Sequence, residues 1–269
     1  MKVAVLLTGQ LRTFEMVKYL HMNSLILKYN ADVFLGINIS NKFQNTPNKN
    51  HTIQTNIEIV NNAINFFNPI DTFILDDFTD EFNKIKSNSN EFNILQFQAM
   101  FEQYYVVKNT YKMLIDNINK GKEYDLIIRL RFDQFIFSDE VPIAPKLYDN
   151  ILETILYNED NTNILKDYTK DKKFIFDEVN DNTVYVFGFG DFKHYKYAND
   201  QFFYHNQSIL TQMFNFYDNI VSLLKYCEEN KIGNLGAIYE CIFYLYITKF
   251  NNINLKKSNI SGIFIREIN

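Results

Sequence analysis

Short apolar runs alternate with helical segments over the first 75 residues of the chain, and this alternation limits the fold more than any other feature. The apolar runs are short enough to be buried strands, whereas the segments between them repeat their apolar positions at helical spacing. The runs are residues 2–7, 31–37 and 70–75, and the helical segments are residues 14–29 and 52–67. This order predicts an α/β fold in which helices cover both faces of a mostly parallel sheet.

The remainder of the chain is richer in helical spacing. The elements predicted there are a long helix over 93–119, strands over 125–130 and 183–187, a helix-rich region over 199–250 and a last strand within 253–267. Two polar segments, residues 38–51 and 146–182, predict loops. We therefore expect one three-layer domain, with a first half near residues 1–137 and a helix-rich second half near residues 138–269.

Composition and charge exclude several classes of protein. The 269 residues are 46% apolar, which is enough for a sizeable core, and the net charge of −5 argues against a nucleic-acid partner. No apolar run is long enough for a signal peptide or a transmembrane segment, and the two cysteines form no disulfide framework. We expect a cytoplasmic protein. The heavy use of Asn, Ile, Lys, Phe and Tyr indicates an AT-rich genome, viral or bacterial.

Two arginines and an aspartate mark the exit of the buried strand in YDLIIRLRFDQFIF. Arg129 and Arg131 are costly to bury unless an anion meets them, and their planar guanidinium groups match phosphate oxygens. Asp133, just beyond the strand, is a candidate oxygen ligand for a divalent cation, Mn²⁺ or Mg²⁺. The set predicts a site for a metal-bound diphosphate. The alternative is a structural Arg–Asp ion pair.

The loop after the first strand is a second candidate binding segment. Gly9 allows close backbone approach to a ligand, and Thr8 and Gln10 flank it with hydrogen-bonding side chains. Arg12 follows at the start of a helix, where the backbone favours an anion. The loop matches neither GxGxxG nor the P-loop, so a dinucleotide or P-loop site is disfavoured. An ordinary strand–helix turn explains the same residues.

Two acidic residues of the second half are candidate catalytic bases. Asp200, in the segment Asn199–Phe202, is expected to open a helix, where it either contacts an acceptor hydroxyl or supports the helix end. Glu240 lies within the apolar segment IYECIFYLYI and either faces solvent or is held there for a purpose. His194 and His205 flank the Asp200 segment as candidate substrate contacts or surface residues.

In their order along the chain, these segments resemble a family of GT-A-fold glycosyltransferases found in viruses and bacteria. The similar segments are VAVLLTGQLRTFE, FEQYYVVKNTYKML, YDLIIRLRFD, YANDQFFYHNQSIL and YECIFYLYI. They correspond to a strand followed by Ser/Thr-Gly-Gln-x-Arg, a long helix, an Arg-x-Arg-x-Asp strand, an acceptor-side helix and a Glu-bearing helix. The resemblance covers most of the chain, and the ordered set is more specific than any one motif.

The resemblance implies a GT-A-like sandwich that transfers a sugar from a nucleotide-sugar donor to a glycan or other hydroxyl acceptor. It places Asp133 at the last carboxylate of the family's usual Asp-x-Asp metal motif. Arg131 stands where the first carboxylate would be, and Phe132 replaces the usual Pro. Asp200 becomes the first candidate base and Glu240 the second. Two rival functions are a nucleotide- or glycan-binding module without turnover and a sugar nucleotidyltransferase.

Overall fold

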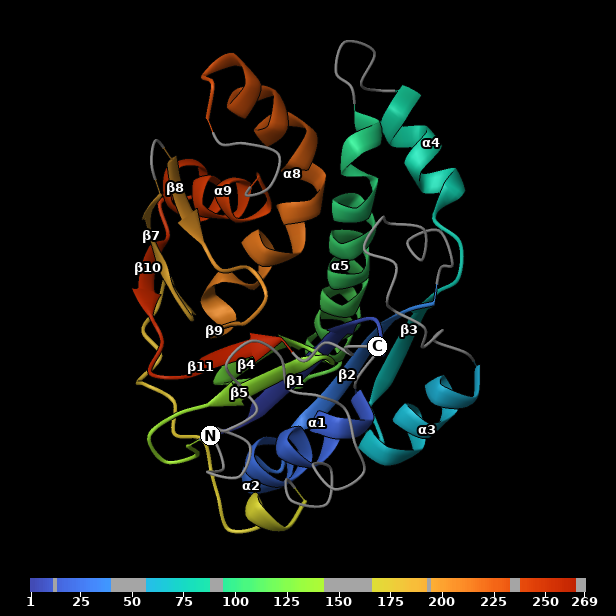
Figure 1. Cartoon of the computed structure of the whole chain (residues 1–269), viewed down its shortest axis with the longest axis vertical. Helices are drawn as coiled ribbons and strands as arrows, with labels where there is room; N and C mark the ends of the chain where they lie inside the picture. Colours follow the sequence, from blue (N-terminus) through green and yellow to red (C-terminus); the bar gives the residue numbers. More distant parts are fainter. Residues whose placement is uncertain are drawn as a thin grey trace.

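Figure 1 shows a computed structural model of the chain, which describes residues 1–11, 14–39, 57–87, 94–142, 166–192, 195–232 and 238–264. The strands are β1 (Val3–Gly9), β2 (Asp32–Asn38), β3 (Asp71–Leu75), β4 (Leu126–Arg131), β5 (Gln134–Phe137), β6 (Thr183–Val186), β7 (Phe189–Phe192), β8 (Tyr195–Ala198), β9 (Phe203–His205), β10 (Asn254–Lys257) and β11 (Ser261–Phe264). The main helices are α1 (Phe14–His21), α2 (Leu27–Tyr29), α3 (Ile57–Phe67), α4 (Thr79–Ser87), α5 (Gln98–Ile118), α8 (Leu210–Glu229) and α9 (Ile238–Leu245).

A seven-stranded sheet lies at the centre of the molecule, in the order β10-β6-β9-β4-β1-β2-β3. Strand β1 pairs in parallel with both β2 and β4, β2 pairs in parallel with β3, and β10 pairs in parallel with β6. Only β9 runs the other way, antiparallel to both β4 and β6. The predicted α/β class and mostly parallel sheet are confirmed, and the sheet takes strands from both sides of residue 137.

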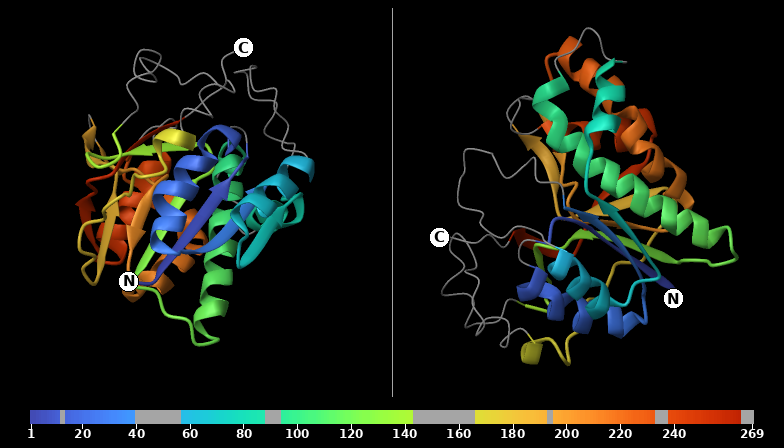
Figure 2. Two further views of the ribbon diagram at one scale, coloured as in Figure 1. Left: turned by 90° about the horizontal axis from the view of Figure 1, so that it is seen from below. Right: turned by 90° about the vertical axis from the view of Figure 1, so that its right-hand side faces the viewer.

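Helices cover the two faces of this sheet, which gives three layers (Figure 2). Along β1 the side chains alternate between the two layers, as a strand's pleat requires. Ala4 and Leu6 pack in one core with residues of α5, α8 and α9, whereas Val5 and Leu7 pack in the other with residues of α1 and α3. All four of these side chains are buried, which explains the continuous apolar run.

Most of the predicted elements lie where the sequence placed them. The helix expected over 14–29 is α1 and α2 joined by a π-helical turn at Met22–Ile26, and the long helix is a 3₁₀ turn followed by α5. The expected tail strand is present as β10, and β11 adds an antiparallel partner for β5. Residues 40–56 and 143–165 lie outside the described ranges, and so do the parts of the predicted loops that fall on them. No helix in the described ranges is long and apolar enough to span a membrane.

One prediction about local structure was wrong. Asn199–Phe202 does not open a helix; it is a bend that leads into β9, and the next long helix, α8, starts at Leu210. The Asn199 side chain accepts a hydrogen bond from the Gln201 backbone at 3.0 Å, a capping-like contact that serves equally well in a turn. Pairing of β9 with two neighbouring strands outweighs the local helix signal.

Candidate active site

The direction of β9 brings distant segments to one edge of the sheet. Arg129 in β4 lies opposite Phe203, the first residue of β9, and Arg131 lies opposite Thr8 in β1. Because β9 is antiparallel to β4, the residues that precede it lie at the same edge as the carboxyl ends of the parallel strands. Asp200 therefore meets the Thr8 and Arg131 region, although it is far away in sequence. Ligands of open α/β sheets bind at this edge.

Arg129 connects two parts of this edge from within the core. Its side chain is 1% exposed. Its Nε donates to the Thr8 hydroxyl at 3.0 Å, its Nη1 donates to the backbone carbonyl of Asp200, and its guanidinium lies over the Phe203 ring at 5.7 Å. Burial lowers the pKa of Arg129, and the Asp200 carboxylate opposes that shift. The structure thus gives this arginine a positioning role between β1 and the turn before β9.

Arg131 and Asp133 form the ion pair that was the alternative interpretation of this motif. The guanidinium donates from Nε to Asp133 Oδ1 and from Nη2 to Oδ2, both at 2.8 Å. Burial opposes it, but the Asp133 charge and its hydrogen bonds raise the pKa of Arg131. The Arg131 side chain is 19% exposed and that of Asp133 is 6% exposed, so the arginine is the more accessible partner.

These residues do not fit a tightly bound divalent cation. A hard cation needs several oxygen ligands, yet both Asp133 oxygens face the Arg131 guanidinium. Within the described ranges no three His, Cys, Asp or Glu side chains gather as a metal-binding group. The cation inferred from the sequence therefore has no supporting ligand set among these residues, and no step below is routed through it.

The loop after β1 has the backbone that its sequence suggested. Gly9 adopts a φ of +113°, a left-handed conformation that favours glycine, and a Cβ there would meet no atom within 4 Å. Thr8 is buried and committed to Arg129, whereas Gly9 and Gln10 are half-buried. Gly9 and Gln10 thus remain accessible to a ligand. Arg12 lies outside the described residues, so its predicted role is untested.

Asp200 is buried with one carboxylate oxygen bonded and the other free. It is 1% exposed, and its Oδ2 accepts from the Tyr104 hydroxyl at 2.5 Å and from Gln103 Nε2 at 3.2 Å, both on α5. Its Oδ1 is buried with no hydrogen-bond partner in the described structure. A buried polar atom without a partner is uncommon and costly, and such atoms are concentrated at functional sites.

Glu240 joins Asp200 from a different element. It lies in the first turn of α9 and is half-buried, and burial together with the Asp200 charge raises its pKa. The same two carboxylates help burial to raise the pKa of the adjacent Tyr239 to about 12. The two candidate bases, identified separately in the sequence, therefore belong to one electrostatic cluster.

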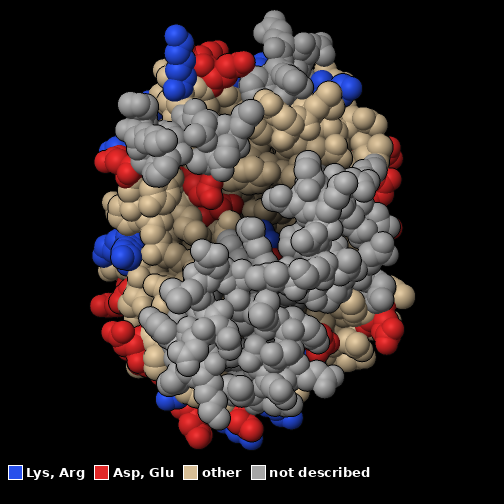
Figure 3. Space-filling view, viewed as in Figure 1, with Lys and Arg blue, Asp and Glu red and all other residues tan. Residues whose placement is uncertain are grey.

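One face of the molecule is hollowed. In Figure 3 a depression opens between the α8 and α9 layer and the sheet, with acidic atoms below α9 and basic atoms deeper in the opening. Both kinds of charge are thus accessible from the same face. A site with opposite charges on neighbouring walls suits a substrate that carries an anionic group and a hydroxyl group in different parts.

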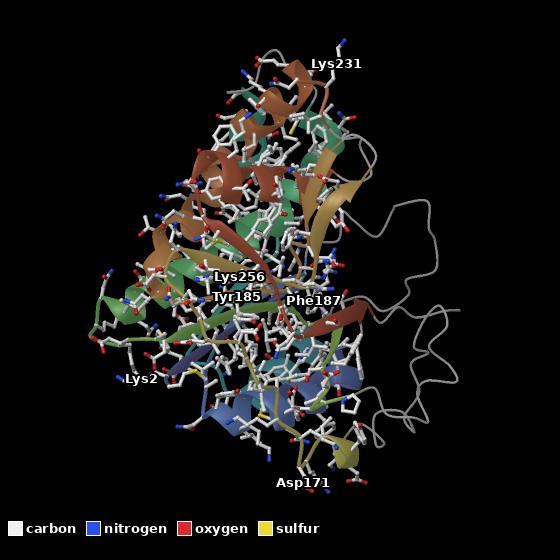
Figure 4. All side chains as sticks on the ribbon, turned by 90° about the vertical axis from the view of Figure 1, so that its left-hand side faces the viewer. Lys2, Asp171, Tyr185, Phe187, Lys231 and Lys256 are labelled. Carbon is white, nitrogen blue, oxygen red and sulfur yellow. The ribbon has the colours of Figure 1, made fainter. Side chains whose placement is uncertain are left out.

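Aromatic residues make the neighbouring wall rigid. Phe187 stacks on the buried Phe202 with ring centroids 4.3 Å apart, and a Cβ on Gly262 would lie 2.3 Å from the Phe187 ring. Figure 4 shows Phe187 beside the outer strands, with Tyr185 of β6 next to Lys256 of β10. These rings pack on one another, and Phe202 is buried within this packing.

Only one of the two flanking histidines lies in the described ranges. His205 is completely buried; its Nδ1 donates to the Asn206 carbonyl at 2.6 Å, and its Nε2 accepts from the Tyr111 hydroxyl at 2.7 Å. Burial lowers the pKa of His205 to about 4. The expectation of a substrate contact or a surface histidine was therefore wrong for His205, because β9 is a central strand. His194 lies outside the described residues.

Sequence reasoning missed the residues of α5 that hold Asp200. Gln103 and Tyr104 read as part of an amphipathic helix with aromatic core positions, and Tyr104 is indeed 2% exposed. Nothing in their local pattern indicates a carboxylate partner 96 or 97 residues further along the chain.

Comparison with protein-family models gives no match, and comparison with curated proteins gives no significant match. The family resemblance therefore stays a prediction.

Proposed function

We propose that this protein is a glycosyltransferase with a GT-A-like fold that moves a sugar from a nucleotide-sugar donor to a hydroxyl acceptor. The observation that carries the proposal is the meeting of cationic and carboxylate groups at one sheet edge. Arg131 ends β4 there, and Asp200 interacts both with Arg131 and with Glu240 in the first turn of α9. Cationic groups stabilise a diphosphate leaving group, and a carboxylate accepts the proton of an alcohol.

The donor is proposed to lie over β1 and β4. Gly9 lets the backbone approach the nucleotide, Gln10 offers hydrogen bonds to it, and Arg131 meets the diphosphate. Negative charge grows on the leaving phosphate oxygen as the sugar–oxygen bond breaks, and a fixed guanidinium stabilises that charge. Arg129 keeps Thr8 and the Asp200 turn in place and does not itself contact the donor.

The acceptor is proposed to enter from the α9 side. Its hydroxyl oxygen forms the new bond to the anomeric carbon, and its proton passes to a carboxylate. Glu240 is the more accessible of the two carboxylates, and the upward shift of its pKa favours proton transfer near neutral pH. Asp200 supplies the buried charge that contributes to this shift, and its unpaired Oδ1 is the second possible proton acceptor.

A thermal-shift screen followed by product analysis tests the proposal. UDP-, GDP- and dTDP-sugars are added with Mn²⁺ or with EDTA, and any stabilising donor is then incubated with glycan acceptors. Transfer or slow donor hydrolysis to the nucleoside diphosphate supports a glycosyltransferase. Release of pyrophosphate from a nucleoside triphosphate and a sugar phosphate would instead identify a nucleotidyltransferase. Stabilisation with no product from any acceptor would favour a binding module.

A further inference from the structure

The environment of Asp200 assigns a role to a residue that carries no recognisable motif. Tyr104 lies on α5, the long helix that packs against β1, β2 and β3, and its side chain is buried. Its hydroxyl donates to Asp200 Oδ2, and Gln103 donates to the same oxygen. Burial and the neighbouring Asp200 charge raise the pKa of Tyr104 well above its usual range, so the hydroxyl keeps its proton and remains a donor.

The pattern of these contacts is asymmetric. Both α5 donors reach one carboxylate oxygen, Oδ2, whereas Oδ1 is buried without a hydrogen-bond partner in the described structure. The backbone carbonyl of the same residue is bonded to Arg129. Backbone and side chain of Asp200 are therefore held from two sides, and one oxygen is left with free acceptor capacity.

We propose that Tyr104 is a positioning residue that holds the Asp200 carboxylate by Oδ2, so that Oδ1 is kept ready to accept a hydrogen bond from a ligand hydroxyl. The effect of this contact on catalysis rests on the proposed function, in which the ligand is the sugar acceptor. The contact between Tyr104 and Asp200 does not depend on that function. A carboxylate held by fixed donors loses less conformational freedom when it binds a ligand than one that can rotate.

The chain offers a matched control for this role. Tyr111 lies two helical turns further along α5, is equally buried, and donates its hydroxyl to His205 instead of a carboxylate. Tyr104→Phe and Tyr111→Phe thus remove the same atom from the same helix at similar burial. Only the first removes a donor to an acidic group.

The first measurement is independent of any enzymatic activity. Thermal unfolding of the wild type, Tyr104→Phe and Tyr111→Phe is followed from about pH 7 down to about pH 4, each also in an Asp200→Asn background. A donor stabilises the charged carboxylate more than the neutral one, so the deficit of Tyr104→Phe should be largest at neutral pH and shrink as the pH falls. The deficit of Tyr104→Phe should not vary with pH in the Asp200→Asn background. The deficit of Tyr111→Phe should be the same with and without Asp200→Asn at each pH, because its partner is His205.

Asp200 has other charged and titratable neighbours in the described structure, and Glu240 needs a control of its own. The charged and titratable groups that interact with Asp200 from the packed elements are Tyr104, Arg129, Arg131, Tyr239 and Glu240. Glu240 also titrates, so the Tyr104→Phe series is repeated with Glu240→Gln, where the pH dependence should persist. A deficit that is the same at every pH, or that disappears with Glu240→Gln, overturns the assignment.

The second measurement uses the donor and acceptor pair that the screen identifies. Tyr104→Phe should lower kcat about tenfold, leave the KM for donor unchanged and move the acid limb of the pH–rate profile to higher pH. Tyr111→Phe should leave that limb in place. If the stability deficit of Tyr104→Phe depends on pH but the acid limb of its pH–rate profile does not move, the contact with Asp200 is supported and its role in catalysis is overturned. Absence of transfer by the wild type would count against the proposed function alone, since the unfolding series decides on the contact without it.

Discussion

Two neighbouring regions at the carboxyl edge of the sheet treat their charges in opposite ways. In the first, Arg131 and Asp133 neutralise each other through two hydrogen bonds of 2.8 Å. In the second, Asp200 Oδ1 is buried with no hydrogen-bond partner among the described residues, and burial together with the Asp200 charge raises the pKa of Glu240. The Arg131–Asp133 pair stabilises the end of β4. The carboxylates of Asp200 and Glu240 are destabilised by burial, and a bound ligand that donates a hydrogen bond to them would relieve part of that cost.

Arg129 lies between these regions, and its replacement should lower the free energy of unfolding more than any other substitution proposed here. Arg129→Met removes the donors to the Thr8 hydroxyl and to the Asp200 backbone carbonyl, and it removes a buried positive charge that interacts with Asp200. Each buried acceptor that is left without its donor costs about 1–3 kcal/mol. Denaturant unfolding should show this loss, and Arg131→Met, at a more exposed position, should cost clearly less. Equal losses would contradict the bridging role.

The carboxylates should dominate turnover. Asp200→Asn or Glu240→Gln should lower the transfer rate by about 10² or more while donor affinity is kept, because removal of a general base has this scale. The larger fall identifies the proton acceptor. Asp218→Asn is the control, since that exposed carboxylate on α8 pairs with Lys108 of α5. If Asp200→Asn and Glu240→Gln both transfer sugar at the wild-type rate, neither carboxylate is the catalytic base.

The loop after β1 should affect donor binding and not chemistry. Gln10→Ala should weaken donor affinity by roughly 1.5–3 kcal/mol, the range for a hydrogen bond to a charged group, with little change in the rate of the bound complex. Isothermal titration with the donor measures the first quantity and single-turnover kinetics the second. The same outcome is expected for Arg12→Ala. Unchanged affinity would move the nucleotide away from β1.

The smallest effect concerns stability as a function of pH. The pKa of Glu240 is raised in the folded protein, so the folded state binds its proton more tightly than the unfolded chain. Stability should therefore fall as the pH rises through the ordinary range of glutamate, about 4.3, toward neutrality. Glu240→Gln removes this term, so it should match the wild type in acid and exceed it near pH 7. A variant less stable at neutral pH would show that the charge is compensated.

The sequence alone determined most of the scaffold. Residues Val3–Leu7 are apolar at every position because both faces of a central strand are buried, and this signal needs no tertiary information. The sequence also identified two separate candidates, Glu240 because a carboxylate in an apolar segment is unusual and Asp200 because its segment was expected to open a helix. It failed at Asn199–Phe202, where a turn into β9 uses the same side-chain contacts as a helix cap.

Only the tertiary structure decided which residues work together. The antiparallel insertion of β9 between β4 and β6 brings the Asp200 turn to Arg129, and the packing of α5 places Tyr104 against the same carboxylate. It also joined Arg131 to Asp133, which the sequence had left open between an ion pair and a metal ligand. Local patterns report the burial of one segment at a time. The partner of a buried charge depends on strand order and helix packing, and these are set by contacts between segments far apart in the chain.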